Sequence, residues 1–255
     1  MKLLAADYDG TLAFNETIMP EDIQAIQEWR AKGNLFVVVT GRAKSAIDEQ
    51  LKKNGIEYDY VVSNCGSLVY NPQHKLLQTL HLDYITGIDT IFIAKETQGV
   101  VSVMANDEQG SHRIIVNTDL RDQKLAHIMP DLKEEEILDL PAYTQVVVSM
   151  ATEEVAKDFA AQLNEHFSGT LTAYPNNYCV DIVSKGISKA TGVEFIKEYE
   201  NVDIDDVYVI GDSYNDIPLL KYGNHPGAMF TAPSQVLDLV QDTYFSVKQF
   251  MDEIE

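Results

Sequence analysis

The sequence is poor in positive charge. Its 255 residues include 19 lysines and arginines against 40 aspartates and glutamates, which gives a formal net charge of −21. A surface with so much negative charge repels nucleic acids and anionic membranes, so we expect neither as a partner. It would also repel a phosphorylated molecule, unless the binding site supplied its own positive charge through a metal ion and a local lysine.

Cysteine and long apolar runs are also scarce. The two cysteines, Cys65 and Cys179, have no second cysteine or histidine at metal-ligand spacing, so we expect two reduced thiols and no zinc site. No apolar run is long enough to cross a bilayer, and too few residues precede Asp7 for a signal peptide. We therefore expect a cytoplasmic globular protein, in agreement with 45% hydrophobic and 23% charged residues.

Both ends of the chain alternate short, almost continuous apolar runs with helical patterns. This alternation is typical of an open parallel sheet that is covered on both faces. The expected strands are 3–6, 35–39, 207–210 and 228–230. One expected helix begins at Pro20, a second ends near Lys53, and three more cover 188–199, 217–222 and 234–240.

The middle of the chain has a different pattern, in which neighbouring strands are joined by short turns. Such pairs are typical of an antiparallel sheet. The expected strands are 100–105, 112–117, 145–150, 171–174 and 178–183, and the expected helices are 84–95, 122–128 and 153–167. We therefore predict an α/β protein in which an α+β domain, 83–183, is inserted into a parallel-sheet core formed by 1–82 and 184–255.

Two aspartates, Asp7 and Asp9, follow the first expected strand. Residues i and i+2 of an extended segment point to the same side, so both carboxylates can face one small volume, and Gly10 permits a sharp turn. Two carboxylates this close are tolerated when a divalent cation lies between them or when one keeps its proton, and Mg²⁺ suits such oxygen ligands. The structural alternative is a strand-end turn in which the aspartates accept from backbone amides.

A second polar group follows the strand at 207–210. Asp212 comes at the end of this strand, and Asn215 and Asp216 follow as a helix starts. Ligands collect at the carboxyl edge of open α/β sheets, so Asp212 can supply a third carboxylate for the cation. A cluster of helix-capping residues is the alternative.

Two further segments are suited to binding phosphate. Thr40-Gly41-Arg42 follows the strand at 35–39 and offers a hydroxyl and glycine amides ahead of a helix, although Thr40 could equally cap that helix. Lys189 opens the helix at 188–199, where a positive charge opposes the helix dipole. Pairing with a phosphate and with Asp7 would explain its position.

In this order, the segments DYDGTL, TGR, a lysine that opens a helix, and GDSYND resemble the four motifs of the haloacid-dehalogenase-like phosphohydrolases. The insert between the second and third motifs resembles the large α/β cap of the Cof-type subgroup, and the resemblance covers nearly the whole chain. It implies a Rossmann-like core, dependence on Mg²⁺ and hydrolysis of phosphate esters.

The resemblance also implies a role for each motif residue. Asp7 would be the nucleophile that forms an aspartyl-phosphate, and Asp9 would be the general acid and then the general base. The Asp7 side chain, the Asp9 backbone carbonyl and Asp212 would hold Mg²⁺, with Asp216 on the metal or just behind its ligands. The phosphoryl oxygens would be contacted by Thr40, the amides of Tyr8 and Gly41, Lys189 and Asn215, and Arg42 is a further candidate for substrate binding.

The sequence departs from the family at Asn64-Cys65-Gly66-Ser67, where relatives commonly have Asn-Gly-Ala. In such folds this position faces the substrate entrance, so Cys65 puts any transfer of specificity in doubt. Alternatively, Cys65 packs as a small apolar group. Ala190 after Lys189, and Phe230-Thr231-Ala232 in place of Gly-Asn-Ala, are further departures, and none removes a group that hydrolysis needs.

We therefore expect a Mg²⁺-dependent phosphatase for small phosphorylated metabolites, with sugar phosphates ahead of nucleotide or cofactor phosphates. A phosphotransferase or mutase that uses the same aspartyl-phosphate remains an alternative, as does a binding regulator without catalysis. The cap would select the leaving group. Its candidate residues are His112, Arg113, Asn117, Tyr143, Tyr174, Asn176, Asn177 and Tyr178.

Overall fold

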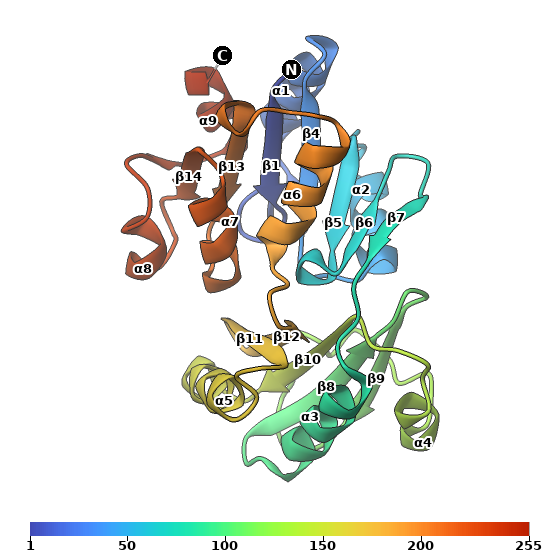
Figure 1. Ribbon diagram of the computed structural model, residues 1–255. Helices are drawn as coiled ribbons and strands as arrows, with labels where there is room; N and C mark the ends of the chain where they lie inside the picture. The colour runs from blue at the N-terminus through green and yellow to red at the C-terminus, as the bar shows by residue number, and fades with distance from the viewer. Residues whose placement is uncertain (255) are drawn as a thin grey trace. The chain divides into compact units, whose positions relative to one another are not determined.

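The computed structural model describes residues 1–254, and the chain forms two compact units. The first unit consists of Met1–Gln78 and the segment from Ser188 onward, and the second is Thr79–Ile187 (Figure 1). The insert predicted from the sequence covers 83–183, whereas the second unit of the structure begins four residues earlier and ends four residues later. The two units have separate sheets and separate hydrophobic cores.

The first unit contains a sheet in the order β15-β14-β13-β1-β4-β5-β6-β7. The strands run parallel from β15 to β5, and β6 pairs with β5 in the antiparallel direction. Their bounds are β1 Leu3–Asp7, β4 Leu35–Val39, β5 Tyr60–Ser63, β6 Leu68–Tyr70, β7 Leu76–Thr79, β13 Val207–Gly211, β14 His225–Met229 and β15 Thr243–Tyr244. The predicted parallel α/β core is confirmed.

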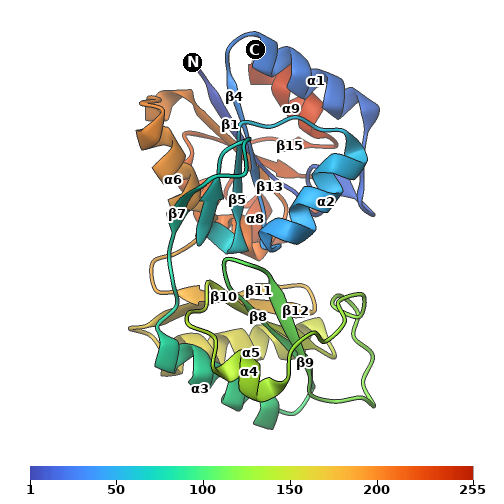
Figure 2. The same ribbon diagram turned by 90° about the vertical axis from the view of Figure 1, so that its right-hand side faces the viewer.

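Helices cover both faces of this sheet. In β1, Leu4 and Ala6 pack toward α1, α2 and α9, whereas Leu3 and Ala5 pack toward α6, α7 and α8, because successive residues of a strand point to opposite faces. Figure 2 shows α1, α2 and α9 on one side of the sheet and α6 on the other. Their bounds are α1 Pro20–Ala31, α2 Lys44–Asn54, α6 Lys189–Tyr199, α7 Ile217–Tyr222, α8 Ser234–Leu237 and α9 Val247–Ile254.

Short elements connect these layers. The strands β2 (Ala13–Phe14) and β3 (Thr17–Ile18) form a small antiparallel hairpin after β1. Single 3₁₀ turns follow β5 and surround β13, namely η1 (Asn64–Gly66), η2 (Ile204–Asp206) and η3 (Tyr214–Asp216). No helix in residues 1–254 is long and apolar enough to span a membrane. Both cysteines are free and buried, as predicted.

The second unit is an antiparallel sheet with helices on one face. Its strand order is β11-β12-β10-β8-β9, and every neighbouring pair is antiparallel. The helices α3, α4 and α5 lie on the same side of this sheet (Figure 2). The bounds are β8 Val100–Asn106, β9 Ser111–Ile115, β10 Gln145–Met150, β11 Leu171–Asn176, β12 Cys179–Ser184, α3 Tyr84–Glu96, α4 Glu134–Leu138 and α5 Glu153–His166.

The predicted helix at 122–128 is wrong. The chain is irregular there, and a short helix, α4, begins only at Glu134. The Asp122 carboxylate accepts from the amides of Lys124 and Leu125, which stabilises a tight turn in place of a helix. Leu125 then packs on the sheet face opposite the helices, beside Met104 and Val147.

Asp122 is also the centre of a buried polar network on that face. Its oxygens accept from Ser102 Oγ at 2.6 Å, from Ser149 Oγ at 2.8 Å and from Arg113 Nη2 at 2.7 Å. The Arg113 Nη1 group donates to the carbonyl oxygen of Ile128. The side chains of Arg113 and Asp122 are only 6% and 4% exposed, so this ion pair is shielded from solvent.

We expect Asp122→Asn to lower the free energy of unfolding at pH 7 by about 3 kcal/mol, because it leaves the Arg113 charge buried without its partner. Urea unfolding measures this value. Asp119→Asn is the control, since Asp119 is exposed on the same irregular segment and should cost almost nothing. Equal losses in the two variants would contradict the network's importance.

The difference in stability between wild type and Asp122→Asn should depend on pH. Burial alone would raise the pKa of Asp122, but hydrogen bonds from Ser102, the Leu125 amide and Ser149 outweigh it and hold the pKa below its usual value. A depressed pKa means that the Asp122 carboxylate adds stability above about pH 4 and loses this contribution as the pH falls further. The gap between wild type and Asp122→Asn should therefore shrink below about pH 4.

Candidate active site

The predicted site residues converge because their strands are neighbours. β1 lies between β13 and β4, with Ala6 opposite Ile210 and Asp7 opposite Val39. All three strands run in the same direction, so the residues after them meet at the carboxyl edge of the sheet, where open α/β folds bind ligands. The Asp7, Thr40 and Asp212 segments therefore lie side by side.

Three carboxylates form a compact cluster at this edge. One oxygen from each of Asp7, Asp212 and Asp216 lies within 4.8 Å of the other two. Asp212 Oδ1 accepts from Thr11 Oγ1 at 2.9 Å, and Asp216 Oδ2 accepts from the Asp212 and Ser213 amides at 3.1 and 3.0 Å. Asp216 thus caps the η3 turn, as the structural alternative suggested, and also faces the cluster with its other oxygen.

Lys189 is buried among these carboxylates. Its ammonium group donates to Asp7 Oδ1 at 2.5 Å, to Asp216 Oδ1 at 2.6 Å and to Asn215 Oδ1 at 3.2 Å. These contacts use all three of its N–H donors. Lys189 is the first residue of α6, with Ser188 as the N-cap. The contacts with carboxylates explain why a positive charge lies at the unfavourable end of the helix dipole.

The electrostatics of the cluster follow from burial and from repulsion among like charges. Burial, and then the nearby Asp216 carboxylate, raise the pKa of Asp7 well above its usual value despite the Lys189 charge. The same two causes raise the pKa of Asp212 to about 6. Burial opposes the charge on Lys189, but the Asp216 and Asp7 carboxylates outweigh it and raise the pKa of the lysine. One lysine therefore does not neutralise the cluster.

The donor set fits a divalent cation. Three carboxylates offer hard oxygen atoms at one point, and a divalent ion would relieve the repulsion that raises the pKa values of Asp7 and Asp212. Asp216 belongs to this cluster through its own carboxylate. The Asp9 side chain lies outside it.

Two glycines let the backbone come this close. A Cβ atom on Gly10, whose φ is +89°, would lie 2.5 Å from Asp212 Oδ2. A Cβ atom on Gly211 would lie 2.5 Å from the Asp216 carboxyl carbon. Both distances are far below van der Waals contact, so a side chain at either position would push an acidic residue away.

Asp9 pairs with Arg42, a contact that was not predicted from the sequence. Arg42 Nε and Nη2 donate to the two carboxylate oxygens of Asp9, each at 2.7 Å, in a bidentate arrangement. The guanidinium carbon lies 5.5 Å from the centre of the Tyr8 ring. Since Asp9 and Arg42 follow the neighbouring strands β1 and β4, strand adjacency was the signal that could have predicted this pair.

Three further residues that the sequence singled out, Thr40, Tyr8 and Cys65, make contacts within the first unit. Thr40 Oγ1 accepts from the Arg42 amide at 3.1 Å, and α2 begins only at Lys44 after Ala43, so Thr40 does not cap that helix. The Tyr8 amide donates to the Val39 carbonyl oxygen at 3.1 Å, so in this structure it is not offered to a phosphate, contrary to expectation. Cys65 is buried at 1% exposure and packs inside the first unit.

Most of the candidate residues of the second unit have partners within that unit. His112 Nδ1 lies 2.8 Å from Asp131, and Asn176 donates to Asp181. The Tyr143 and Tyr174 hydroxyls donate to backbone carbonyls. These contacts give the side chains a structural role.

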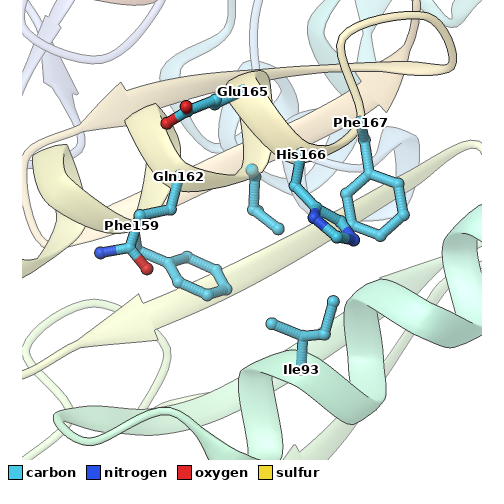
Figure 3. Close-up of a pocket in the computed structure, with 7 residues that line it drawn as sticks. Ile93, Phe159, Gln162, Glu165, His166 and Phe167 are labelled. Carbon is cyan, nitrogen blue, oxygen red and sulfur yellow. The ribbon is translucent and has the colours of Figure 1, made fainter.

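The second unit also has a groove of about 570 Å³ between α3 and α5 (Figure 3). Its lining combines apolar and polar side chains, and none of the cluster carboxylates belongs to it. The lining residues are Ile93, Phe159, Gln162, Leu163, Glu165, His166 and Phe167.

The fold and the site define an α/β enzyme with an acidic centre at the carboxyl edge of its sheet. The model of the haloacid dehalogenase-like hydrolase family matches residues 4–248, so the chain belongs to this family. The family and subgroup predicted from the sequence, the Cof-type haloacid-dehalogenase-like hydrolases, are confirmed.

Individual relatives cover nearly the whole chain. A protein of Metamycoplasma hominis that is named as a phosphatase is 26% identical over 251 residues, which cover 87% of this chain and 83% of that protein. A pyridoxal phosphate phosphatase of Escherichia coli is 24% identical, with 98% and 97% covered. A solved sugar phosphatase of subclass IIB shares the fold, with a TM-score of 0.83 at 19% identity and 100% and 99% covered. The predicted enzyme class, a phosphatase of this family, is confirmed.

We expect Mg²⁺ to stabilise the chain and Asp212→Asn to abolish this effect. At a concentration of 100 times the dissociation constant, the ion should add about 2.7 kcal/mol, which raises Tm by roughly 5 °C. Without the ion, Asp212→Asn should be at least as stable as wild type, because it removes one of three repelling charges. Thermal unfolding with MgCl₂ and with EDTA measures both effects.

Asp238→Asn is the matched control, since Asp238 is an exposed acid in the same unit and should leave the Mg²⁺ effect unchanged. An undiminished Tm shift in Asp212→Asn would show that the ion binds elsewhere.

Proposed function

We propose that this phosphatase hydrolyses small phosphorylated metabolites, with sugar phosphates as the first candidates, by way of an aspartyl-phosphate on Asp7 and with Mg²⁺ as cofactor. One observation carries the proposal. The Asp7 carboxylate is buried at the strand end, 2.5 Å from a lysine ammonium group and within reach of two further carboxylates. The sugar phosphatase and pyridoxal phosphate phosphatase among its similar proteins support the substrate class.

In the first step an Asp7 oxygen attacks phosphorus, and the ester bond to the leaving oxygen breaks. The leaving oxygen takes a proton from Asp9. In the second step Asp9 accepts a proton from water as the water attacks the aspartyl-phosphate, which releases inorganic phosphate and regenerates the Asp7 carboxylate. A carboxylate nucleophile thus divides one difficult displacement into two easier ones.

The side chains of Asp7, Asp212 and Asp216, together with the Asp9 backbone carbonyl, would hold Mg²⁺. When bound, the ion supplies positive charge that stabilises the charge developing on the phosphoryl oxygens. Lys189 supplies a second positive charge beside Asp7. Its longest contact, 3.2 Å to Asn215, is the one that a phosphoryl oxygen can replace at the lowest cost. Thr40, Gly41 and Asn215 complete the proposed phosphate contacts.

Arg42 holds the ionised form of Asp9, which is the form that accepts a proton from water in the second step. The bidentate contact fixes both oxygens of a side chain that is 50% exposed and would otherwise rotate freely. Asp9 therefore stays at the mouth of the site, apart from the cluster that contains Asp7.

Asp7→Asn should reduce kcat for p-nitrophenyl phosphate by a factor on the order of 10³ or more, because an amide cannot form the aspartyl-phosphate. Circular dichroism and Tm would show that the variant is folded. Full activity in this variant would refute Asp7 as the nucleophile.

A panel of phosphorylated metabolites, assayed for phosphate release with Mg²⁺ and with EDTA, identifies the substrate class. Transfer of the phosphoryl group to an added sugar, in place of phosphate release, would indicate a phosphotransferase instead.

Arg42→Lys should lower kcat by about tenfold, equal to ~1.4 kcal/mol in the activation free energy, because lysine cannot replace the planar bidentate contact with Asp9. Steady-state kinetics on p-nitrophenyl phosphate test this. Arg30→Lys is the control, since Arg30 makes the same kind of bidentate contact with Asp59 within the first unit and outside the site. If Arg42→Lys and Arg30→Lys have the same kcat, Arg42 does not hold Asp9 for catalysis.

A further inference from the structure

The turn after β5 has an unusual backbone. Three successive residues adopt positive φ values, namely Asn64 (49°), Cys65 (52°) and Gly66 (105°), and all three are buried. Asparagine and glycine tolerate this conformation, but cysteine seldom adopts it. Such a conformation persists only where the surrounding structure requires it, and conformations of this kind cluster at functional sites.

One side of the turn is attached to the segment that follows β4. The Asn64 amide donates to the Arg42 carbonyl oxygen, and the Cys65 amide donates to the Thr40 carbonyl oxygen, each at 3.1 Å. The segment of Thr40 and Arg42 is the one that borders the acidic cluster. The turn is therefore fixed to one wall of the site.

The other side of the turn presses against the start of α6. A Cβ atom on Gly66 would lie 1.9 Å from the Ser188 carbonyl oxygen and 2.6 Å from its carbonyl carbon. The Ser188 oxygen is held in turn by the Thr191 amide and hydroxyl, at 3.1 and 2.7 Å. Backbone thus meets backbone at the N-cap of α6, with no flexible side chain between them.

Lys189 is the residue that directly follows this contact. Its ammonium group must lie 2.5 Å from Asp7 and 2.6 Å from Asp216 at the end of a fully buried side chain. Ser188 is the N-cap of α6 and Lys189 is its first residue. A shift of Ser188 would therefore move the Lys189 backbone and carry its ammonium group away from Asp7.

We propose that the turn Asn64–Gly66 is a positioning element for Lys189, in which the left-handed backbone at Asn64 and Cys65 brings Gly66 against Ser188 and Gly66 sets the position of Ser188. The inference rests on the proposed function, since Lys189 is one of the groups that would bind the phosphoryl oxygens. Gly66 is the positioning residue, and it acts on the reaction only through Lys189; at position 65 the backbone conformation matters and the thiol does not.

The test compares Gly66→Ala with Gly55→Ala. Gly55 also has a positive φ, 66°, but a Cβ atom there meets nothing within 4 Å. Both variants place alanine in a left-handed backbone, but only Gly66→Ala also forces a Cβ atom against the Ser188 carbonyl group, so it should lose more thermal stability and displace Ser188. We expect kcat for p-nitrophenyl phosphate to fall by about tenfold to 10²-fold in Gly66→Ala, and by less than about twofold in Gly55→Ala.

A second measurement does not depend on activity. Lysine acylation by acetic anhydride, followed by mass spectrometry, reports how well each ammonium group is protected. Lys189 is only 1% exposed and should react slowly in wild type and in Gly55→Ala. In Gly66→Ala we expect its acylation rate to rise by about tenfold or more relative to the exposed Lys52, because displacement opens the site.

A variant pair at Cys65 covers the case in which Gly66→Ala does not fold. Cys65→Gly keeps the left-handed backbone and should retain kcat and Lys189 protection, whereas Cys65→Val, with a β-branched side chain, should lose both. Equal kcat and equal acylation within each pair would overturn the positioning role. If wild type hydrolysed no phosphate ester, the proposed function would fail, but the acylation contrast would still decide the role of the turn.

Discussion

The ammonium group of Lys189 lies among carboxylates that repel one another in a place shielded from water. Burial raises the cost of every unpaired charge, so the position of this one cation determines how the acidic residues can be arranged. Asp7 and Asp216 come from opposite ends of the sequence, on β1 and after β13, and Lys189 contacts both. The parallel sheet brings the acids together, and α6 brings the charge that makes their proximity tolerable.

Close packing of backbone around the cluster follows from this arrangement. Asp212 and Asp216 lie where a side chain on Gly10 or Gly211 would be, and Ser188 lies where one on Gly66 would be. Each glycine therefore marks a point where backbone reaches a charged residue, or the residue before one, without intervening atoms. This close packing leaves the acidic side chains little room to move, and preorganised charges of this kind act at reacting atoms without reorganisation.

Much of the core could be predicted from the sequence, because buried parallel strands are apolar runs that end in polar residues. Asp7 and Asp212 were predicted in this way, and Lys189 from its unfavourable position at the start of a helix. The Asp9–Arg42 pair follows from the adjacency of β1 and β4, which apolar runs alone do not give. The helix expected at 122–128 is absent because one carboxylate, that of Asp122, accepts from amides in a turn. The Tyr8 amide was misjudged because the hydrogen bonding of a strand end depends on its neighbour, β4.

The charge balance of the site bears on how a negatively charged protein binds a phosphate ester. The cluster sets three carboxylates against one lysine, and Arg42 is already occupied by Asp9. A phosphate group entering this site would meet more negative than positive charge, on a chain whose net charge is −21. Within residues 1–254, Lys189 is the one lysine or arginine that pairs with the cluster carboxylates. A multivalent cation would reverse the sign of the charge within this small volume. The proposed cation ligands and the proposed nucleophile, Asp7, therefore belong to a single electrostatic arrangement.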